Sequence, residues 1–203
     1  MFSSGRLGHS LTHRTTSFRN ELTSIIRSIE FLLALFLFVG SLCWASGPDI
    51  SAARDYRLRF YHTHTGERLD IVYRRGDIYL PDALAQLDHF LRDHRTGDVH
   101  HYNPKVFDLL HDLTEALEDS GGEIDVVCGY RSPWSNEFLR HRSARSGVAE
   151  RSLHMQAEAI DIRLPGIPTS EVRDAALKLH RGGVGYYRAS DFVHVDVGRV
   201  RRW

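Results

Sequence analysis

The chain has 203 residues, of which 42% are hydrophobic, 26% charged and 10% aromatic. This composition is that of a folded globular protein, and it excludes a disordered, collagen-like or multi-span membrane protein. Lysine plus arginine and aspartate plus glutamate balance at 26 each. No net charge therefore attracts nucleic acid or an anionic membrane surface.

The first 45 residues are predicted to be an export signal. Segment 1–30 is polar and has more arginine than glutamate, the run from Phe31 to Leu42 is apolar, and the small residue Ala45 precedes a turn-forming stretch. This order is typical of a cleaved signal peptide. We expect cleavage after Ala45, which leaves a periplasmic protein of residues 46–203. An uncleaved anchor in the inner membrane is the alternative.

The remainder is predicted to form one domain that mixes strands and helices. Strands are expected where apolar and polar residues alternate, and helices where apolar residues recur every three or four positions. In chain order these elements are strands over 56–62 and 69–74, helices over 81–91 and 103–121, a strand over 124–128, a helix from 133, a strand over 159–164, a helix over 169–180, and strands over 184–187 and 192–197. They follow no regular βαβ order, so the predicted fold class is α+β. Only Cys128 remains after signal cleavage, which excludes an internal disulfide.

Two histidines and one aspartate in the C-terminal half have the composition of a catalytic metal site. His154 and Asp161 are seven residues apart, and His194 follows later in a valine-rich strand. Asp161 alternates with Ile160 and Ile162, so its side chain points away from the apolar face of its strand. Two imidazoles and a carboxylate with an open fourth position suit a catalytic zinc ion. Spacing alone leaves the alternative open, which is a surface aspartate and a core histidine.

Two other histidines, His101 and His62, are not predicted to bind a metal. His101 and Asp108 repeat the spacing of His154 and Asp161, but they have no third ligand in register, so we interpret them as a chance pair. His62 lies at the end of the predicted hairpin and is expected at the surface.

Three segments carry a resemblance to a known family. They are GYRSPWSN (129–136), GVAERSLHMQAEAIDIRLPG (147–166) and GGVGYYRASDFVHVDVGRVRRW (182–203). They resemble the zinc murein endopeptidases of the murein endopeptidase K type, which belong with the D-Ala-D-Ala carboxypeptidases and share the hedgehog-like zinc fold. The upstream segments HTGERLDIVYRRG (64–76) and LRDHRTGDV (91–99) also resemble that group, so the resemblance covers 56–203. It implies a mostly antiparallel sheet flanked by helices. Ala157 departs from the family, which usually has glycine there, and this matters if the position requires a positive φ.

The resemblance also implies roles for particular residues. It implies one zinc ion per chain, with His154, Asp161 and His194 as ligands. Arg131 matches an arginine that relatives place over the scissile carbonyl, where a guanidinium stabilises an oxyanion or binds a carboxylate. The alternative for Arg131 is a surface residue that pairs with the following helix.

The general base is expected among the acidic residues around His194. Asp191, three residues before His194, is the candidate that the resemblance favours. Asp196, two residues after His194, is its rival, either as the base or as the residue that orients His194.

The expected function is hydrolysis of amide bonds in peptidoglycan stem-peptide crosslinks by an exported, monomeric zinc peptidase. The resemblance favours crosslinks between two diaminopimelate residues. The alternatives are a D-Ala-D-Ala or L,D-carboxypeptidase, a non-catalytic murein-binding module of the same fold, and a surface-anchored structural protein. Neither nucleic acid nor, after signal cleavage, a membrane is an expected partner.

Overall fold

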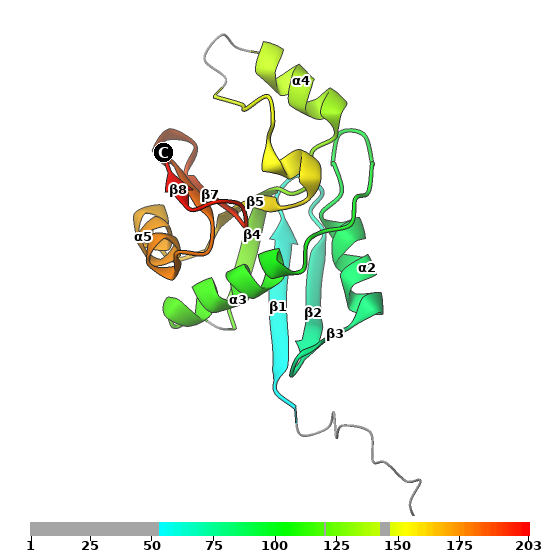
Figure 1. Cartoon of the computed structure of the whole chain (residues 1–203), viewed down its shortest axis with the longest axis vertical. Helices are drawn as coiled ribbons and strands as arrows, with labels where there is room; N and C mark the ends of the chain where they lie inside the picture. Colours follow the sequence, from blue (N-terminus) through cyan, green and yellow to red (C-terminus); the bar gives the residue numbers. More distant parts are fainter. Residues whose placement is uncertain (1–52, 120, 143–146) are drawn as a thin grey trace, which may run out of the picture. The chain divides into compact units, whose positions relative to one another are not determined.

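The computed structural model describes residues 53–119, 121–142 and 147–203 (Figure 1). The predicted signal peptide over 1–45 and the start of the predicted domain lie outside these residues. Within the described part, no helix has both the length and the apolar character needed to cross a membrane.

The described domain is built on one eight-stranded sheet with the strand order β3-β2-β1-β4-β5-β7-β6-β8. The strands are β1 (Asp55–His62), β2 (Arg68–Arg75), β3 (Ile78–Tyr79), β4 (Glu123–Cys128), β5 (Ala159–Arg163), β6 (Gly183–Tyr187), β7 (Phe192–Asp196) and β8 (Arg201–Arg202). The α+β class is confirmed. The expectation of a mostly antiparallel sheet is wrong, because the sheet is mixed: β1 pairs with β4, and β6 with β8, in parallel. Parallel pairing of β1 with β4 requires a long connection between the two strands. The chain between them, which contains β2, β3 and two helices, provides that connection.

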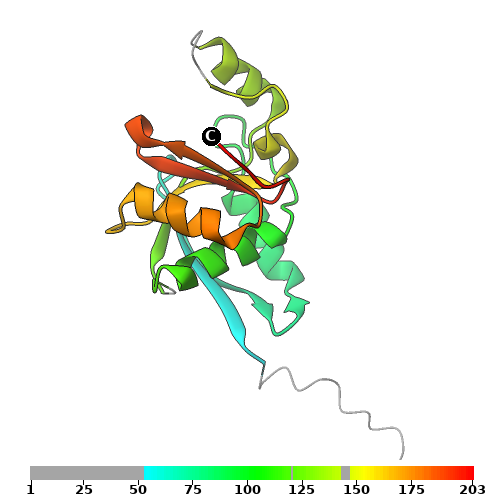
Figure 2. The same cartoon turned by 60° about the vertical axis from the view of Figure 1, so that its left-hand side comes forward.

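Three helices cover one face of this sheet: α2 (Pro81–Phe90), α3 (Lys105–Ala116) and α5 (Thr169–Leu179). Figure 2 shows α3 and α5 lying side by side over the strands, and α5 packs on β6 and β7. Phe60 of β1 packs against Phe90 of α2, and Tyr73 of β2 packs against Phe107 of α3. Since alternate strand residues point to opposite faces, the polar residues between these core positions lie on the face that the three helices leave uncovered.

Helix α4 (Pro133–His141) begins at a clear sequence signal. Ser132 caps it by accepting a hydrogen bond from the backbone N–H of Ser135, and Pro133 occupies the first turn, where a missing N–H is tolerated. Figure 1 shows α4 above the ends of β1 and β4, at the same end of the sheet as the short 3-10 helix η2 (Leu153–Gln156).

The structure tests two predictions about histidines, one for His62 and one for the pair of His101 and Asp108. His62 is fully buried rather than at the surface, because the alternation that buries Phe60 places His62 on the same face of β1. The chance pair does not form a site: His101 Nδ1 lies 2.8 Å from an Asp88 carboxylate oxygen, whereas Asp108 accepts hydrogen bonds from two tyrosines.

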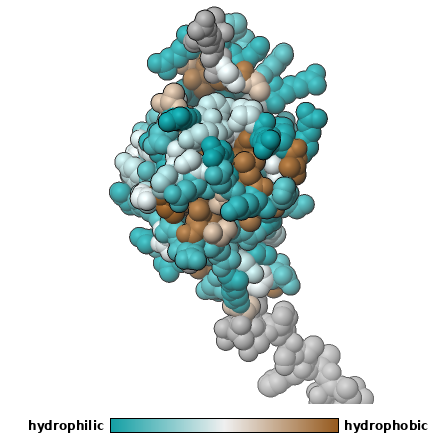
Figure 3. Space-filling view, turned by 90° about the vertical axis from the view of Figure 1, so that its left-hand side faces the viewer, coloured by the Kyte–Doolittle hydropathy of each residue, from teal (hydrophilic) through white to brown (hydrophobic). Residues whose placement is uncertain are grey.

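Figure 3 views the domain from the side on which α5 and β8 lie in Figure 1. In that view, hydrophobic residues form small separate areas between hydrophilic ones. This is the surface of a domain whose apolar residues lie mainly between the sheet and its helices.

Candidate metal centre

The structure brings His154, Asp161 and His194 together on the sheet face that the three helices leave uncovered. Asp161 of β5 and His194 of β7 are direct partners in the antiparallel register of the two strands. His154 comes from η2, which directly precedes β5. All three side chains are buried.

The potential ligand atoms of these residues form a nearly regular triangle. His154 Nε2 lies 3.2 Å from Asp161 Oδ1 and 3.1 Å from His194 Nδ1. His194 Nδ1 lies 2.9 Å from Asp161 Oδ1. Atoms bound at about 2.0–2.1 Å to a tetrahedral zinc ion lie about 3.3 Å apart, so this triangle is close to one face of a zinc tetrahedron. The donor set of two imidazoles and a carboxylate also suits zinc.

The other nitrogen of each imidazole is occupied by a protein acceptor. His154 Nδ1 donates to the carbonyl oxygen of Gly129 at 2.8 Å, and His194 Nε2 donates to Asp196 Oδ2 at 3.1 Å. A neutral histidine that donates from one nitrogen presents a lone pair on the other. When both imidazoles are neutral, their lone pairs are therefore directed at the space between His154 Nε2, His194 Nδ1 and Asp161 Oδ1.

Asp196 is held as a carboxylate in contact with His194. It is fully buried, and it accepts hydrogen bonds from the backbone N–H groups of Gly183 and Gly198, each at 2.9 Å. Arg201 NH2 donates to it at 2.7 Å. Burial opposes ionisation, but His194, Arg201 and the two backbone donors hold the pKa of Asp196 well below its usual range. Its oxygen atoms thus have partners already, which favours the orienting role over that of a base.

The electrostatics favour a cation at the centre of the triangle. Burial lowers the pKa of His154, but the Asp161 carboxylate and the Cys128 sulfur outweigh burial and raise this pKa to about 10. Burial raises the pKa of Asp161, whereas His154 and His194 lower it to well below its usual range. Positive charge is therefore stabilised next to Asp161.

Arg131 lies beside this centre, after the end of β4. Its NH2 atom is 3.8 Å from Asp161 Oδ2 and 3.4 Å from Cys128 Sγ, and its NH1 donates to Asn136 Oδ1 at 3.3 Å. The side chain is buried, unlike the surface arginine of the alternative interpretation. The guanidinium thus borders the centre without entering the triangle of ligand atoms.

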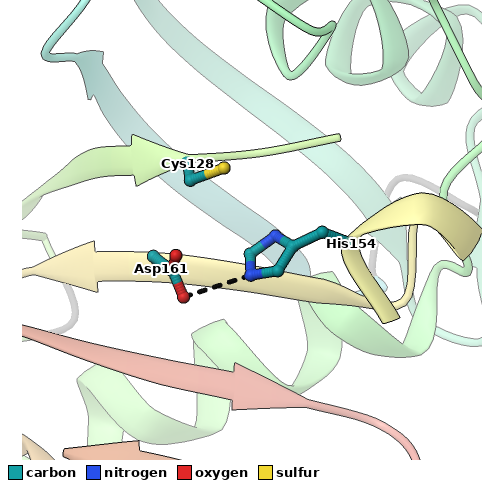
Figure 4. A group of neighbouring side chains, drawn as sticks. All are labelled: Cys128, His154 and Asp161. Carbon is teal, nitrogen blue, oxygen red and sulfur yellow. Dashed lines mark hydrogen bonds and ion pairs between the residues drawn. The ribbon is translucent and has the colours of Figure 1, made fainter. Parts of the chain in front are cut away.

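Cys128 is a neighbour that the sequence analysis did not anticipate. Figure 4 shows Cys128, His154 and Asp161 converging from β4, η2 and β5, and their potential ligand atoms lie within 4.8 Å of one another. Cys128 is paired with Asp161 across a register shift that follows Val126. Strand alternation without that irregularity places Cys128 on the same face as Val126, so the sequence pattern contains no signal for this contact. The atoms of the His154–Asp161–His194 triangle are closer together, at 2.9 to 3.2 Å.

The structure does not bring the carboxylate of Asp191 to the centre. Asp191 is exposed and has a φ of 51°, and its Oδ1 accepts a hydrogen bond from the Thr169 hydroxyl at 2.8 Å. Its neighbours Ser190 and Phe192 both line the cavity in front of the ligand triangle. Asp191 therefore lies at the rim of the cavity, with its carboxylate bound to the start of α5.

This cavity has a volume of about 330 Å³. Residues 147–149 and 151–153 form one part of its lining, and Tyr187, Phe192, Arg201 and Trp203 form another. The Trp203 ring lies 5.2 Å from the His194 ring, and Trp203 Nε1 donates to the Tyr187 hydroxyl at 3.0 Å. Trp203 was not predicted as a site residue, because only the pairing of β8 with β6 carries it to the cavity.

Ala157 has a left-handed backbone conformation with a positive φ, the condition under which its departure from the family's glycine matters. It ends η2 with φ 51° and ψ 41°. This explains a preference for glycine at the position, since a Cβ atom is strained there.

Comparison with known proteins identifies the family of the chain. The family model described as peptidoglycan L,D-endopeptidase MepK matches residues 50–203. The chain belongs to this family. The probable MepK of Haemophilus influenzae is 40% identical over 154 residues, which are 76% of this chain and 82% of that relative. The MepK of Escherichia coli is 39% identical over 154 residues, or 76% of this chain and 83% of that relative. No solved structure matches the chain. The MepK family match confirms the resemblance found in the sequence.

Proposed function

We propose that the chain is an exported, zinc-dependent peptidoglycan endopeptidase that cleaves crosslinks between two diaminopimelate residues. The observation that carries this proposal is the convergence of His154 Nε2, Asp161 Oδ1 and His194 Nδ1, with both histidines oriented by other groups, in a member of the MepK family. His154, Asp161 and His194 hold one zinc ion per chain in this proposal. A bound zinc ion supplies Lewis acidity and lowers the pKa of bound water to about 7.

Arg131 stabilises the developing charge in the proposed reaction. When water attacks the scissile amide, it gives a proton to the general base, and negative charge forms on the carbonyl oxygen. The tetrahedral species then re-forms the carbonyl and expels the amine, which takes up that proton. The buried guanidinium is held by Asn136 and Cys128, and its Nε has no hydrogen-bond partner among the described residues, so it is a preorganised donor for that oxygen. Removal of such a donor from other enzymes costs about 10²–10³ in rate.

We retain Asp191 as the proposed general base. Its place at the rim, between two lining residues, supports this role, although its carboxylate must first leave the Thr169 hydroxyl. Asp196 is the weaker candidate because His194, Arg201 and two backbone N–H groups already occupy its oxygen atoms.

We also propose that residues 1–45 direct export and that 46–203 form the monomeric catalytic domain in the periplasm. The apolar run and the small residue at position 45 support this proposal. N-terminal sequencing of the protein recovered from the periplasm tests it: a start at Ser46 is expected, and an intact N-terminus in the membrane fraction contradicts cleavage.

The deciding experiment is digestion of intact crosslinked sacculi by the purified protein, with and without a chelator. Mass spectrometry of the muropeptides is expected to show loss of dimers linked through two diaminopimelate residues, and the chelator is expected to abolish that loss. Loss of terminal D-alanine alone favours the carboxypeptidase. Unchanged muropeptides from a folded, zinc-loaded sample favour the binding module.

A further inference from the structure

The arginines that line the cavity differ in how far they are engaged. Arg201 donates to Asp196 through NH1 and NH2, at 3.1 and 2.7 Å. Arg131 is bound to Asn136 and Cys128 and lies near Asp161. Arg151 also lines the cavity, is exposed, and makes no hydrogen bond or ion pair with any described residue. No described residue therefore holds the Arg151 guanidinium away from a ligand in the cavity.

Arg151 lines the same cavity as His154, Asp161 and His194. It lies three residues before His154, and Ser152 and Leu153 between them also line the cavity. Among the described lining residues the only carboxylate side chain is that of Asp161, one of the three residues of the triangle, whereas three of the lining residues are arginines. The lining thus carries an excess of positive charge that suits an anionic group of the substrate.

A second part of the lining is aromatic. Tyr187 stacks on Phe192 with ring centroids 4.5 Å apart, and Trp203 is hydrogen-bonded to Tyr187. A cavity with one basic and one aromatic part matches a chemical group that has an aliphatic chain and a carboxylate. Diaminopimelate is such a group: in a crosslink between two of these residues, the carbon that bears the acylated amine keeps a free carboxylate beside the scissile amide.

We propose that Arg151 binds this free carboxylate and thereby selects crosslinks with ionised diaminopimelate over those with the amidated form. The inference rests on the proposed function, because it names the group that the same cavity recognises. A guanidinium can bind a carboxylate through two parallel hydrogen bonds, whereas a carboxamide carries no charge and offers only one acceptor oxygen. Binding at Arg151 positions the adjacent amide in front of the ligand triangle.

The test compares two synthetic crosslinked dimers, one with free and one with amidated diaminopimelate carboxylates. The wild-type protein is expected to prefer the free dimer by about tenfold in kcat/KM, mainly through KM. Arg151→Gln is expected to raise KM for the free dimer about tenfold and to abolish the preference, and Arg151→Lys to restore part of it. The matched control is Arg140→Gln, because Arg140 pairs with Glu137 on α4 and lies outside the cavity lining. It is expected to behave like the wild type.

Measuring the affinity for the two dimers without cleavage distinguishes failure of the Arg151 proposal from failure of the proposed function. Calorimetry measures the affinity of metal-stripped wild type and Arg151→Gln for both dimers, without any cleavage. A preference for the free dimer that Arg151→Gln retains, or no preference in the wild type, overturns the role of Arg151. If the zinc-loaded wild type cleaves neither dimer, the proposed function fails, and the affinities alone then decide whether Arg151 binds the carboxylate.

Discussion

Ala157 is a residue whose backbone conformation is unfavourable for its side chain. It sits three positions after His154 with φ 51°. An L residue in this region costs about 1–2 kcal/mol, so Ala157→Gly is expected to raise the free energy of unfolding by about 1 kcal/mol. Denaturant unfolding measures this difference. The matched control is Ala176→Gly inside α5, where the same change is expected to lower stability by about 1 kcal/mol. Equal losses in both variants would refute the strain at Ala157.

The ligand set can be distinguished from the neighbouring cysteine by substitution. His194→Ala removes one corner of the ligand triangle and is expected to lower zinc affinity by at least about 100-fold. Cys128→Ala removes a sulfur atom that contacts Arg131 and is expected to keep zinc bound with near-normal affinity. Zinc content after dialysis against a competing chelator measures both. Loss of zinc from Cys128→Ala would place the sulfur among the ligands.

Zinc uptake is expected to depend on pH because a proton competes for His154. The pKa of His154 is raised to about 10, so this imidazole is protonated at neutral pH without the metal, and zinc must displace that proton. Affinity should therefore rise about tenfold for each pH unit between pH 6 and 8. Calorimetry in buffers of different ionisation enthalpy counts the released protons. A constant affinity over this range contradicts the prediction.

Asp191 and Asp196 should respond differently to the same substitution. As the proposed base, Asp191→Asn is expected to lower kcat about 100-fold or more with zinc content unchanged. Asp196→Asn removes a charge that Arg201 and His194 contact, so it is expected to lower stability as well as zinc affinity. Kinetics combined with zinc analysis separates the two effects. A normal kcat in Asp191→Asn would show that Asp191 is not the general base.

At the scale of elements, the last strand matters because it places an aromatic ring beside the site. Trp203 N donates to the carbonyl of Val184, and the Trp203 ring lies over Gly185, where a Cβ atom would come within 2.6 Å of the ring. Gly185→Ala must therefore displace the ring from its place near His194.

This displacement gives a prediction for β6 and β8. Gly185→Ala is expected to lower kcat/KM about tenfold, because small misplacements in a site have large effects. The same change in a Trp203→Ala background should have little further effect, since no ring is left to displace. A double-mutant cycle of kcat/KM measures the coupling. Fully additive losses would show that Gly185 acts independently of Trp203.

Most elements could be predicted because their hydrophobic patterns repeat over enough residues to be distinguished from chance. The alternation of β1 and the apolar spacing of α3 locate both to within a few residues. The two-residue strands β3 and β8 were missed, since two residues contain no periodicity. The parallel β1–β4 pair was missed as well, because pairing depends on the path of the chain across the helices and not on local pattern.

At the scale of the whole domain, the centre is assembled by strand order and not by sequence proximity. His154, Asp161 and His194 could be proposed from residue type, strand alternation and family resemblance. Cys128 and Trp203 could not, because a register shift beside β4 and the outer position of β8 bring them to the same place. The orientation of Asp191 toward Thr169 is likewise a property of the folded loop.

The position of Trp203 also has a practical consequence for anyone who produces this protein. Residues fused after Trp203 begin at the rim of the cavity, with the Trp203 ring 5.2 Å from that of His194. A polyhistidine purification tag at that end would bring additional imidazoles to a site built to bind zinc, and it would distort both metal stoichiometry and substrate access. An affinity handle for biochemical work therefore belongs at the opposite terminus of the domain, with a protease site for its removal.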